Sequence, residues 1–393
     1  MSLLQLNPPQ RDAIKYVDGP LLVLAGAGSG KTRVITQKIC HLIRECGYEA
    51  RHIAAITFTN KAAREMLERV GKLMDSRELK GITVSTFHSL GMHILRQEAP
   101  HLGYKTQFSI LDSYDAAKII SDILKSTHKD EVRKVQSRIS LWKNELLDAD
   151  AALVAADNEF DRICATTYSA YQATLMAYQA MDFDDLIRLP VGLFQTHPEV
   201  LIKWQGRLRY LLIDEYQDTN TCQYRLVKLL AGVRGLFTAV GDDDQSIYAW
   251  RGANMENLRL LQHDFPALKI VKLEQNYRST ARILRAANSV ISNNPKLFEK
   301  QLWSELGLGE PIHAVMCKDE DHEAEIVVQR LLAHKFEYHT SFKDYAILYR
   351  GNYQSRVFET ALRNQRIPYQ MAGGQSFFDK PEIKDVLAYL RLI

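Results

Sequence analysis

A glycine-rich segment at residues 25–32 has the residue types and spacing of a phosphate-binding loop. It follows the apolar run 21–25 and precedes apolar residues that recur at helical spacing. Glycines allow backbone N–H groups to turn toward a phosphate, and the start of a helix adds its positive dipole end. The alternative is a glycine-rich turn that merely exposes a lysine. The loop comprises Ala25, Gly26, Ala27, Gly28, Ser29, Gly30, Lys31 and Thr32.

A lysine, a bound Mg²⁺ ion and two carboxylates would complete a phosphoryl-transfer site. Lys31 is expected to reach the β and γ phosphates, and Thr32 to ligate Mg²⁺. A second apolar run, 210–213, ends in Asp214 and Glu215. We expect Asp214 to hold Mg²⁺ through water and Glu215 to take a proton from the attacking water. Taken alone, acidic residues at a strand end are common, and only their pairing with Lys31 makes this carboxylate pair informative.

Residues 241–252, GDDDQSIYAWRG, follow the apolar run 237–240 and combine carboxylates, an amide and aromatic rings. Ligands of parallel sheets bind at the carboxyl ends of strands. Gln245 is therefore expected to sense the γ-phosphate, while Tyr248 and Trp250 offer stacking surfaces to bases. Ordinary core packing of the two aromatics is the alternative.

Three more strand ends carry polar or aromatic side chains. TFTNK at 57–61 and STFH at 85–88 suit a sugar-phosphate chain, and Phe58 suits the face of a base. In QNYRS at 275–279, Arg278 could reach the γ-phosphate and Tyr277 could stack on adenine. For all three segments the alternative is that these side chains only cap helices and close turns.

The elements that must position these residues alternate along the chain as in an α/β protein with a parallel sheet. Helical spacing dominates from 89 to 206, and strand-like runs then resume, which predicts a discontinuous first domain. A second α/β unit is expected after 280, with further strands at 312–316 and 345–349. The six runs expected in the first sheet are 21–25, 53–58, 82–87, 210–213, 237–240 and 270–273.

Composition restricts the class of protein but not its ligand. The 393 residues carry a formal net charge of +3 and are 46 % hydrophobic and 25 % charged, which is typical of a globular protein and excludes collagen-like or disordered chains. No apolar run approaches the roughly 20 residues of a bilayer span, and no secretory signal is visible. We therefore expect no membrane association and a cytoplasmic location. The five scattered cysteines favour neither a disulfide framework nor a zinc site.

Taken in order, the motifs resemble those of the superfamily 1 DNA helicases of the UvrD, PcrA and Rep group. The resemblance covers essentially the whole chain, and the stretches RHIAAITFTNKAAREM and DYAILYRGNYQSRVFE look most like the Rep members. The motifs that carry it are LNPPQ, AGAGSGKTR, TFTNKAAREM, STFH, FDDL, LLIDEYQDTN, VGDDDQSIYAWRGA and LEQNYRS.

This resemblance implies a P-loop, RecA-like α/β fold and an ATP- and Mg²⁺-dependent helicase that moves 3′ to 5′ on single-stranded DNA. Its partners would be single strands and single-strand/duplex junctions, with the protein acting as monomer or dimer in replication or repair. Gln10 would read the adenine edge, Arg33 and Tyr277 would sandwich the ring, and Gln245 and Arg278 would contact the γ-phosphate. The DNA track would comprise Phe58, Asn60, Thr86, His88, Tyr248, Trp250 and Arg251.

The resemblance also implies a division of the chain. Residues 1–88 and 207–280 would form the first RecA-like domain, with 89–206 as a helical accessory insertion. Residues 281–375 would begin the second RecA-like domain, and 376–393 a second insertion. Late motifs of the group are not found before Ile393, so we expect a truncated chain. Two rivals remain: a fragment that binds nucleotide and DNA without efficient turnover, and a P-loop enzyme unrelated to nucleic acid.

Overall fold

The computed structural model describes residues 6–249, 252–371 and 381–390. The chain forms two compact units, Met1–Pro311 and Ile312–Ile393, and each is described by itself. In the described part of the chain, no helix is both long enough and apolar enough to cross a membrane.

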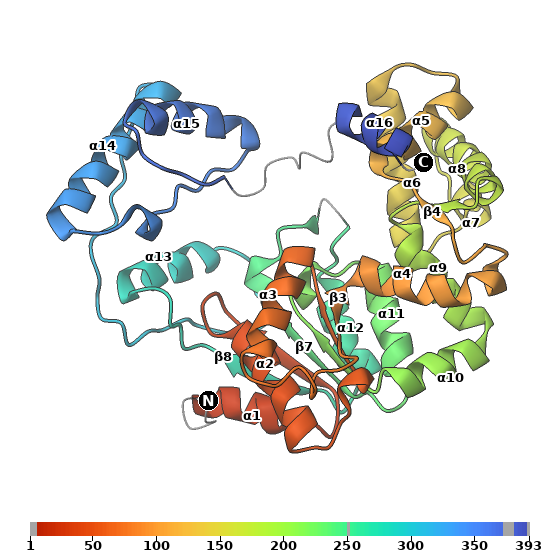
Figure 1. The fold of residues 1–393 in the computed structure, drawn as a ribbon, viewed down its shortest axis with the longest axis horizontal. Coiled ribbons are helices and arrows are strands. Elements are labelled where there is room, and N and C mark those ends of the chain that lie inside the picture. The colour runs from red at the N-terminus through yellow and green to blue at the C-terminus, as the bar shows by residue number, and fades with distance from the viewer. Residues whose placement is uncertain (1–5, 250–251, 372–380, 391–393) are drawn as a thin grey trace. The chain divides into compact units, whose positions relative to one another are not determined.

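A six-stranded parallel sheet is the centre of the first unit (Figure 1). Its spatial order is β3-β2-β6-β7-β1-β8, so strands from before and after residues 89–206 are interleaved. The predicted runs agree with the strands to within one residue at each end. The strands are β1 (Leu21–Ala25), β2 (Ile53–Thr57), β3 (Thr83–Thr86), β6 (Tyr210–Ile213), β7 (Phe237–Gly241) and β8 (Lys269–Leu273).

The four central strands of this sheet, β1, β2, β6 and β7, are buried on both faces, which explains why they read as nearly continuous apolar runs. The edge strands β3 and β8 are partly exposed and carry polar residues. Alternate side chains of β1 point to opposite faces: Leu22 and Leu24 lie in one core, and Leu21 and Val23 in the other. The second core contains α1 (Pro8–Lys15), α2 (Lys31–Arg44) and α3 (Asn60–Gly71). The first core contains α4 (Phe87–Glu98), α9 (Asp185–Thr196), α10 (Pro198–Arg207), α11 (Thr221–Ala231) and α12 (Glu256–Asp264).

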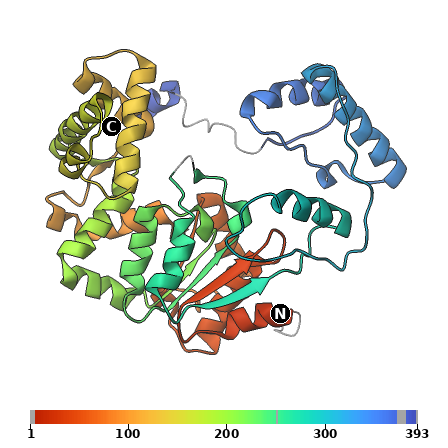
Figure 2. The same ribbon diagram turned by 180° about the vertical axis from the view of Figure 1, so that it is seen from behind.

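The helices that lie between β3 and β6 in the sequence form a separate hydrophobic core. Trp142, Tyr168 and Tyr171 are buried there, away from the sheet. This helical region also contains a two-residue parallel pair, β4 (Ser109–Ile110) with β5 (Ala180–Met181). Figure 2 shows the same region from behind. Its helices are α5 (Ser113–Leu124), α6 (Lys129–Asn144), α7 (Ala149–Val154) and α8 (Glu159–Ala177).

The first unit ends after α13 (Ala281–Ile291), and the second unit contains α14 (Glu320–Tyr338), α15 (Ser355–Asn364) and α16 (Pro381–Leu390). The strands predicted at 312–316 and 345–349 are wrong, because neither segment is a strand. A strand exists only where its backbone hydrogen-bonds to a neighbour, and neither segment joins a ladder among the described residues. Ile312 and Leu348 are accordingly 61 % and 92 % exposed.

Candidate nucleotide site and nucleic-acid interface

The carboxyl ends of the parallel strands gather the predicted functional segments at one edge of the sheet. Parallel strands must all end at the same edge, so residues far apart in sequence become neighbours there. The P-loop follows β1, and the motif carboxylates, amides and aromatics follow the other strands. The residues directly after β2, β6, β7 and β8 are Phe58, Asp214, Asp242 and Glu274.

The P-loop adopts a backbone that its glycines permit. Gly28 and Gly30 have φ values of +69° and +92°, in the left-handed region that favours glycine. Gly30 is the N-cap of α2, and Lys31 is the first residue of the helix. Inside the loop, Ser29 Oγ donates a 2.7 Å hydrogen bond to the Gly26 carbonyl. The loop therefore presents the start of a 14-residue helix to the space beside it, which is the geometry that binds phosphate.

Lys31 joins the P-loop to the segments after β6 and β7. Its ammonium lies 2.9 Å from Glu215 Oε2 and donates a longer, 3.5 Å hydrogen bond to Gln245 Oε1. The three side chains come from three different strand ends. Since the Lys31 and Glu215 side chains are 12 % and 34 % exposed, the pair is partly desolvated but open to a ligand. A γ-phosphate entering here would meet one cation, one amide and one carboxylate able to accept a proton.

Asp214 and Thr32 supply oxygen donors of the kind that Mg²⁺ prefers. Asp214 is only 8 % exposed, and its backbone N–H donates to Ile56 O at 2.8 Å, which extends the pairing of β6 with β2. Burial, followed by the negative charge of Glu215, raises the pKa of Asp214 to about 6. The nearby positive charge and hydrogen bond do not offset the cost of burying this carboxylate, so the position fits a site that a bound cation would complete.

Two polar residues next to Glu215 have contacts that the sequence does not reveal. Gln217, only 2 % exposed, donates from Nε2 to Glu215 Oε2 at 2.9 Å and accepts at Oε1 from the Asp242 N–H, also at 2.9 Å. It thus connects the ends of β6 and β7. Burial also raises the pKa of Asp218 to about 6. Both residues lie within LLIDEYQDTN, but nothing in that motif predicts which partners the amide of Gln217 takes or that Asp218 is buried.

The QNYRS segment packs directly on the P-loop. Asn276 Nδ2 donates to the Ala27 carbonyl at 2.5 Å, and the Tyr277 N–H donates to the Gly28 carbonyl at 2.9 Å. A Cβ at Gly28 would lie only 2.7 Å from Cβ of Arg278, so this segment packs too closely on the loop to leave room for a side chain at position 28. Asn276, to which the sequence assigns no role, is therefore the residue that attaches this segment to the loop.

Gln10 lies behind the P-loop and takes part in two sets of bonds. Its Nε2 donates to the Ser29 carbonyl at 2.9 Å, and its Oε1 accepts from the Asn7 N–H at 3.2 Å in the capping box of α1. Asn7 also donates from Nδ2 to the Tyr277 hydroxyl at 2.9 Å. The structure thus brings Gln10 and Tyr277 into one network beside the loop. Arg33 lies half-buried in the first turn of α2.

A buried lysine, Lys38, anchors the helix that carries Gln10. Its side chain extends from α2, is fully buried, and donates to the carbonyls of Ala13 and Tyr16 at 2.8 and 2.5 Å. These carbonyls lie at the carboxyl end of α1, where a cation also offsets the helix dipole. Burial is the main reason that the pKa of Lys38 is lowered to about 7.

Lys38 should make the stability of the fold depend on pH between about 7 and 10. In that range the unfolded chain holds a proton on Lys38 that the folded chain does not, so the free energy of unfolding rises with pH. The expected slope from this residue approaches about 1.4 kcal/mol per pH unit. Urea unfolding of the chain and of Lys38→Met at pH 7 and 9 measures it. Equal slopes for the two proteins would contradict the assignment.

A cavity of about 1180 Å³ opens beside the nucleotide segments, between the sheet edge and helices α5 and α6. The rings of Phe58 and Tyr248 stack at its wall with centroids 5.4 Å apart and planes 20° from parallel. His88 packs edge-on against Phe183 at 6.1 Å, and burial lowers the pKa of His88. Flat aromatic faces beside a cavity of this size suit the stacking of nucleobases.

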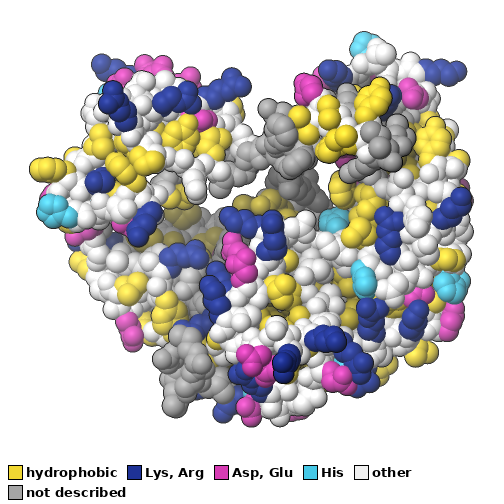
Figure 3. Space-filling view, viewed as in Figure 1, with side chains coloured by type: hydrophobic (Ala, Val, Ile, Leu, Met, Phe, Trp, Pro, Cys, Tyr) yellow, Lys and Arg dark blue, Asp and Glu magenta, His cyan; other side chains and the backbone are white. Residues whose placement is uncertain are grey.

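Two other residues of the expected DNA track, Asn60 and Thr86, lie outside this cavity. Asn60 is exposed at the start of α3, and the Thr86 hydroxyl caps α4 by accepting from the Ser89 N–H at 3.2 Å. Neither lines the cavity. Trp250 and Arg251 lie outside the described residues. On the face drawn in Figure 3, Lys and Arg side chains are interspersed with acidic and uncharged ones, as the small net charge leads one to expect.

A parallel sheet with a P-loop after one strand and a carboxylate pair after another defines a P-loop nucleotide-binding protein. Profiles described as "UvrD/REP helicase N-terminal domain" and "UvrD-like helicase C-terminal domain" match residues 6–266 and 271–393. The chain therefore belongs to the UvrD/REP helicase family. The resemblance to this family in the order of the motifs is confirmed, as is the α/β fold class.

Individual relatives agree with the family assignment. ATP-dependent DNA helicase Rep of Escherichia coli (strain K12) is 57 % identical over 393 residues, covering 99 % of this chain and 58 % of the relative. The Rep helicase of Salmonella typhimurium (strain LT2) is 56 % identical with the same coverage. ATP-dependent DNA helicase PcrA of Staphylococcus aureus (strain Mu50) is 46 % identical, over 99 % of this chain and 53 % of the relative. The chain thus spans little more than half the length of these relatives.

Proposed function

We propose that this chain is the ATP-driven motor part of a DNA helicase that translocates 3′ to 5′ on single-stranded DNA and opens single-strand/duplex junctions. The observation that carries the proposal is the short distance in sequence between the two sites. Gln245, which contacts Lys31 in the nucleotide site, is three residues from Tyr248, which stacks on Phe58 at the cavity. Movement of one short segment can therefore connect the phosphate site to a base-stacking site.

The family membership supports ATP as the nucleotide, and the names of the relatives support DNA as the substrate. We assign 1–88 and 207–280 to a RecA-like motor domain, 89–206 to a helical accessory insertion, 281–375 to the start of a second such domain and 376–393 to the start of a second insertion. A cytoplasmic protein acting in DNA replication or repair is the corresponding cellular role. The protein would act on DNA as a monomer or a dimer.

In this mechanism, the backbone N–H groups of the P-loop and the Lys31 ammonium bind the β and γ phosphates. Mg²⁺, held by Thr32 and by Asp214 through water, would neutralise charge that develops on the phosphates. Glu215 accepts the proton of the attacking water. Gln245 and Arg278 contact the γ-phosphate and lose that contact on hydrolysis, which changes the segment that carries Tyr248. Gln10, Arg33 and Tyr277 hold the adenine.

In the proposed mechanism, DNA binds to the stacked rings of Phe58 and Tyr248 and to the other residues of the expected DNA track. Phe58 and Tyr248 separate to admit a base between or beside their rings, and His88 borders the same cavity. Asn60, Thr86, Trp250 and Arg251 are assigned to the remaining DNA track by the family resemblance. Closure and reopening around each nucleotide would advance the strand by one base.

Stimulation of ATP hydrolysis by single-stranded DNA tests this proposal. A motor should hydrolyse ATP faster when a single strand is added, whereas a P-loop enzyme unrelated to nucleic acid should not respond. Tight binding of both ligands without hydrolysis by the 393-residue chain would support the fragment alternative, and a chain extended to the length of the relatives should then hydrolyse ATP. No DNA response in either chain would refute the proposal.

Replacement of Phe58 by alanine should weaken binding of single-stranded DNA by roughly 1–3 kcal/mol, because it removes one stacking face. The effect should be similar for different sequences, and the log–log salt slope of roughly −0.7 per neutralised phosphate should be unchanged. Fluorescence anisotropy of labelled oligonucleotides measures both. Phe160→Ala is the matched control, since that ring is 42 % exposed and does not line the cavity. Equal losses for both variants would argue against stacking at Phe58.

A further inference from the structure

The segment 298–303 runs back across the ends of β7, β1 and β8. Leu302 lies over the P-loop, where a Cβ at Gly26 would come within 2.3 Å of its Cδ2. The Trp303 carbonyl accepts a 2.7 Å hydrogen bond from the N–H of Asn276. The backbone N–H of Phe298 donates to Asp243 Oδ2 at 3.2 Å. The segment thus contacts three of the strand ends that carry the nucleotide motifs.

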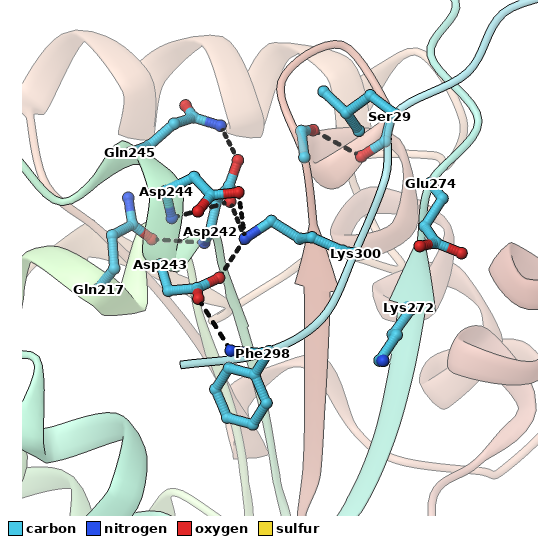
Figure 4. Close-up of polar contacts among 12 residues, drawn as sticks. Ser29, Gln217, Asp242, Asp243, Asp244, Gln245, Lys272, Glu274, Phe298 and Lys300 are labelled. Carbon is cyan, nitrogen blue, oxygen red and sulfur yellow. Dashed lines mark hydrogen bonds and ion pairs between the residues drawn. The ribbon is translucent and has the colours of Figure 1, made fainter. Parts of the chain in front are cut away.

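Lys300 lies in the middle of this segment and points into the turn after β7 (Figure 4). Its ammonium is 2.7 Å from Asp242 Oδ1 and 2.9 Å from Asp244 Oδ2, and it also pairs with Asp243 Oδ1. The Lys300 side chain is only 4 % exposed, and those of Asp242 and Asp243 are 3 % and 2 % exposed. One cation therefore serves three carboxylates, two of which are almost completely buried.

Electrostatics require a cation at this position. The three carboxylate oxygens lie within 4.8 Å of one another, which would be strongly repulsive without a positive charge between them. Although burial lowers the pKa of Lys300, its hydrogen bonds to the aspartates outweigh that effect and raise it, so the side chain stays charged. The ammonium occupies the place that a divalent cation would take in an acidic cluster, and it is supplied by the chain itself.

The same carboxylates lead directly to the phosphate end of the nucleotide site. Asp242 Oδ2 accepts a hydrogen bond from Gln245 Nε2, and Gln245 Oε1 accepts from Lys31. The Asp242 N–H donates to Gln217, whose other amide atom donates to Glu215 Oε2. Lys300 is therefore separated by only Asp242 from Gln245, and by Asp242 and Gln217 from Glu215.

We propose that Lys300 is a positioning residue for nucleotide hydrolysis: its ammonium holds the turn 242–244 in place, and through Asp242 it orients Gln245 and Gln217 toward the γ-phosphate and Glu215. The proposal rests on the function proposed above, since it assigns a role in the same nucleotide site. It adds the segment 298–303 as the structural partner of the turn after β7.

The test compares Lys300→Ala with Lys72→Ala in the 393-residue chain. Lys72 is an exposed lysine that follows the last turn of α3, outside both the segment 298–303 and the turn 242–244. Binding of a fluorescent, non-hydrolysable ATP analogue with Mg²⁺ is measured by titration. Loss of the charged hydrogen bonds that hold Asp242 should weaken binding by about tenfold in Lys300→Ala, with no change in Lys72→Ala.

Chemical rescue separates positioning from a general loss of structure. Ethylammonium can enter the space left by the lysine side chain and donate to the three carboxylates, so it should restore most of the lost affinity in Lys300→Ala. Tetramethylammonium at the same ionic strength has no N–H donor and should not. Lys72→Ala and the unmodified chain should respond to neither ion. Equal nucleotide affinity of folded Lys300→Ala and the unmodified chain, or equal rescue by both ions, would overturn the proposal.

Two further comparisons keep the result interpretable. If Lys300→Ala does not give a cooperative thermal transition, Asp242→Asn replaces it, because this change keeps the side-chain shape but weakens the link from Lys300 to Gln245. Affinity for the analogue should fall several-fold, and an unchanged affinity would refute the positioning role. If the unmodified chain itself fails to bind the analogue, the proposed nucleotide site is wrong, which is a different outcome from unaltered binding by the variants.

Discussion

Replacement of Lys31 by alanine should lower the affinity for an Mg²⁺–ATP analogue by on the order of 100-fold or more. Lys31 is the sole side-chain cation of residues 25–32, and charge-assisted hydrogen bonds to phosphate are among the strongest polar contacts a protein makes. The fold should survive, because the partner carboxylate, Glu215, is 34 % exposed and exposed ion pairs contribute at most about 1 kcal/mol. Titration with a fluorescent analogue measures the affinity.

Lys72→Ala is the matched control for this change. Lys72 follows the last turn of α3 and is exposed to solvent, so its loss should alter neither nucleotide affinity nor the melting temperature. A folded Lys31→Ala chain that binds the analogue as tightly as the Lys72→Ala chain would show that residues 25–32 are not a phosphate site.

Replacement of Glu215 by glutamine should lower DNA-stimulated ATP hydrolysis by roughly 10²–10⁴-fold, the usual contribution of a general base. Nucleotide affinity should change by no more than a few-fold, because the glutamine side chain can still accept a hydrogen bond from Lys31, and Thr32 and Asp214 are retained. Steady-state hydrolysis with saturating single-stranded DNA, in a chain extended to the length of the relatives, is the measurement.

The geometry at Glu215 explains why this replacement is a sharp test. Its backbone has φ of +50°, which is uncommon for a residue with a side chain, and its carboxylate lies 2.9 Å from the Lys31 ammonium. Glu299→Gln is the control, since that side chain is 89 % exposed. If Glu215→Gln hydrolyses ATP at the rate of Glu299→Gln, another group takes the proton and the role assigned to Glu215 is wrong.

Periodicity predicted the four central strands of the sheet well because a strand buried on both faces must be largely apolar. The edge strands β3 and β8 are partly exposed, and their apolar residues are interspersed with polar ones. Periodicity failed at 312–316 and 345–349, where the residues are just as apolar but the backbone has no strand beside it in the described part of the chain. The side-chain pattern reports only the preference of a segment for the strand conformation. Whether the segment becomes a strand depends on a partner that can be far away in sequence.

The sequence alone determined that chemistry-bearing residues lie at the ends of the apolar runs 21–25, 53–58, 82–87, 210–213, 237–240 and 270–273, because motif order and strand spacing are local properties. Parallel pairing then requires these residues to meet at one edge. Only the tertiary structure decided their partners: that Gln217 joins the ends of β6 and β7, that Phe58 stacks on Tyr248, and that Lys300 neutralises the turn after β7. Such contacts join residues up to about 190 positions apart, and their geometry depends on the order β3-β2-β6-β7-β1-β8, which no local pattern encodes.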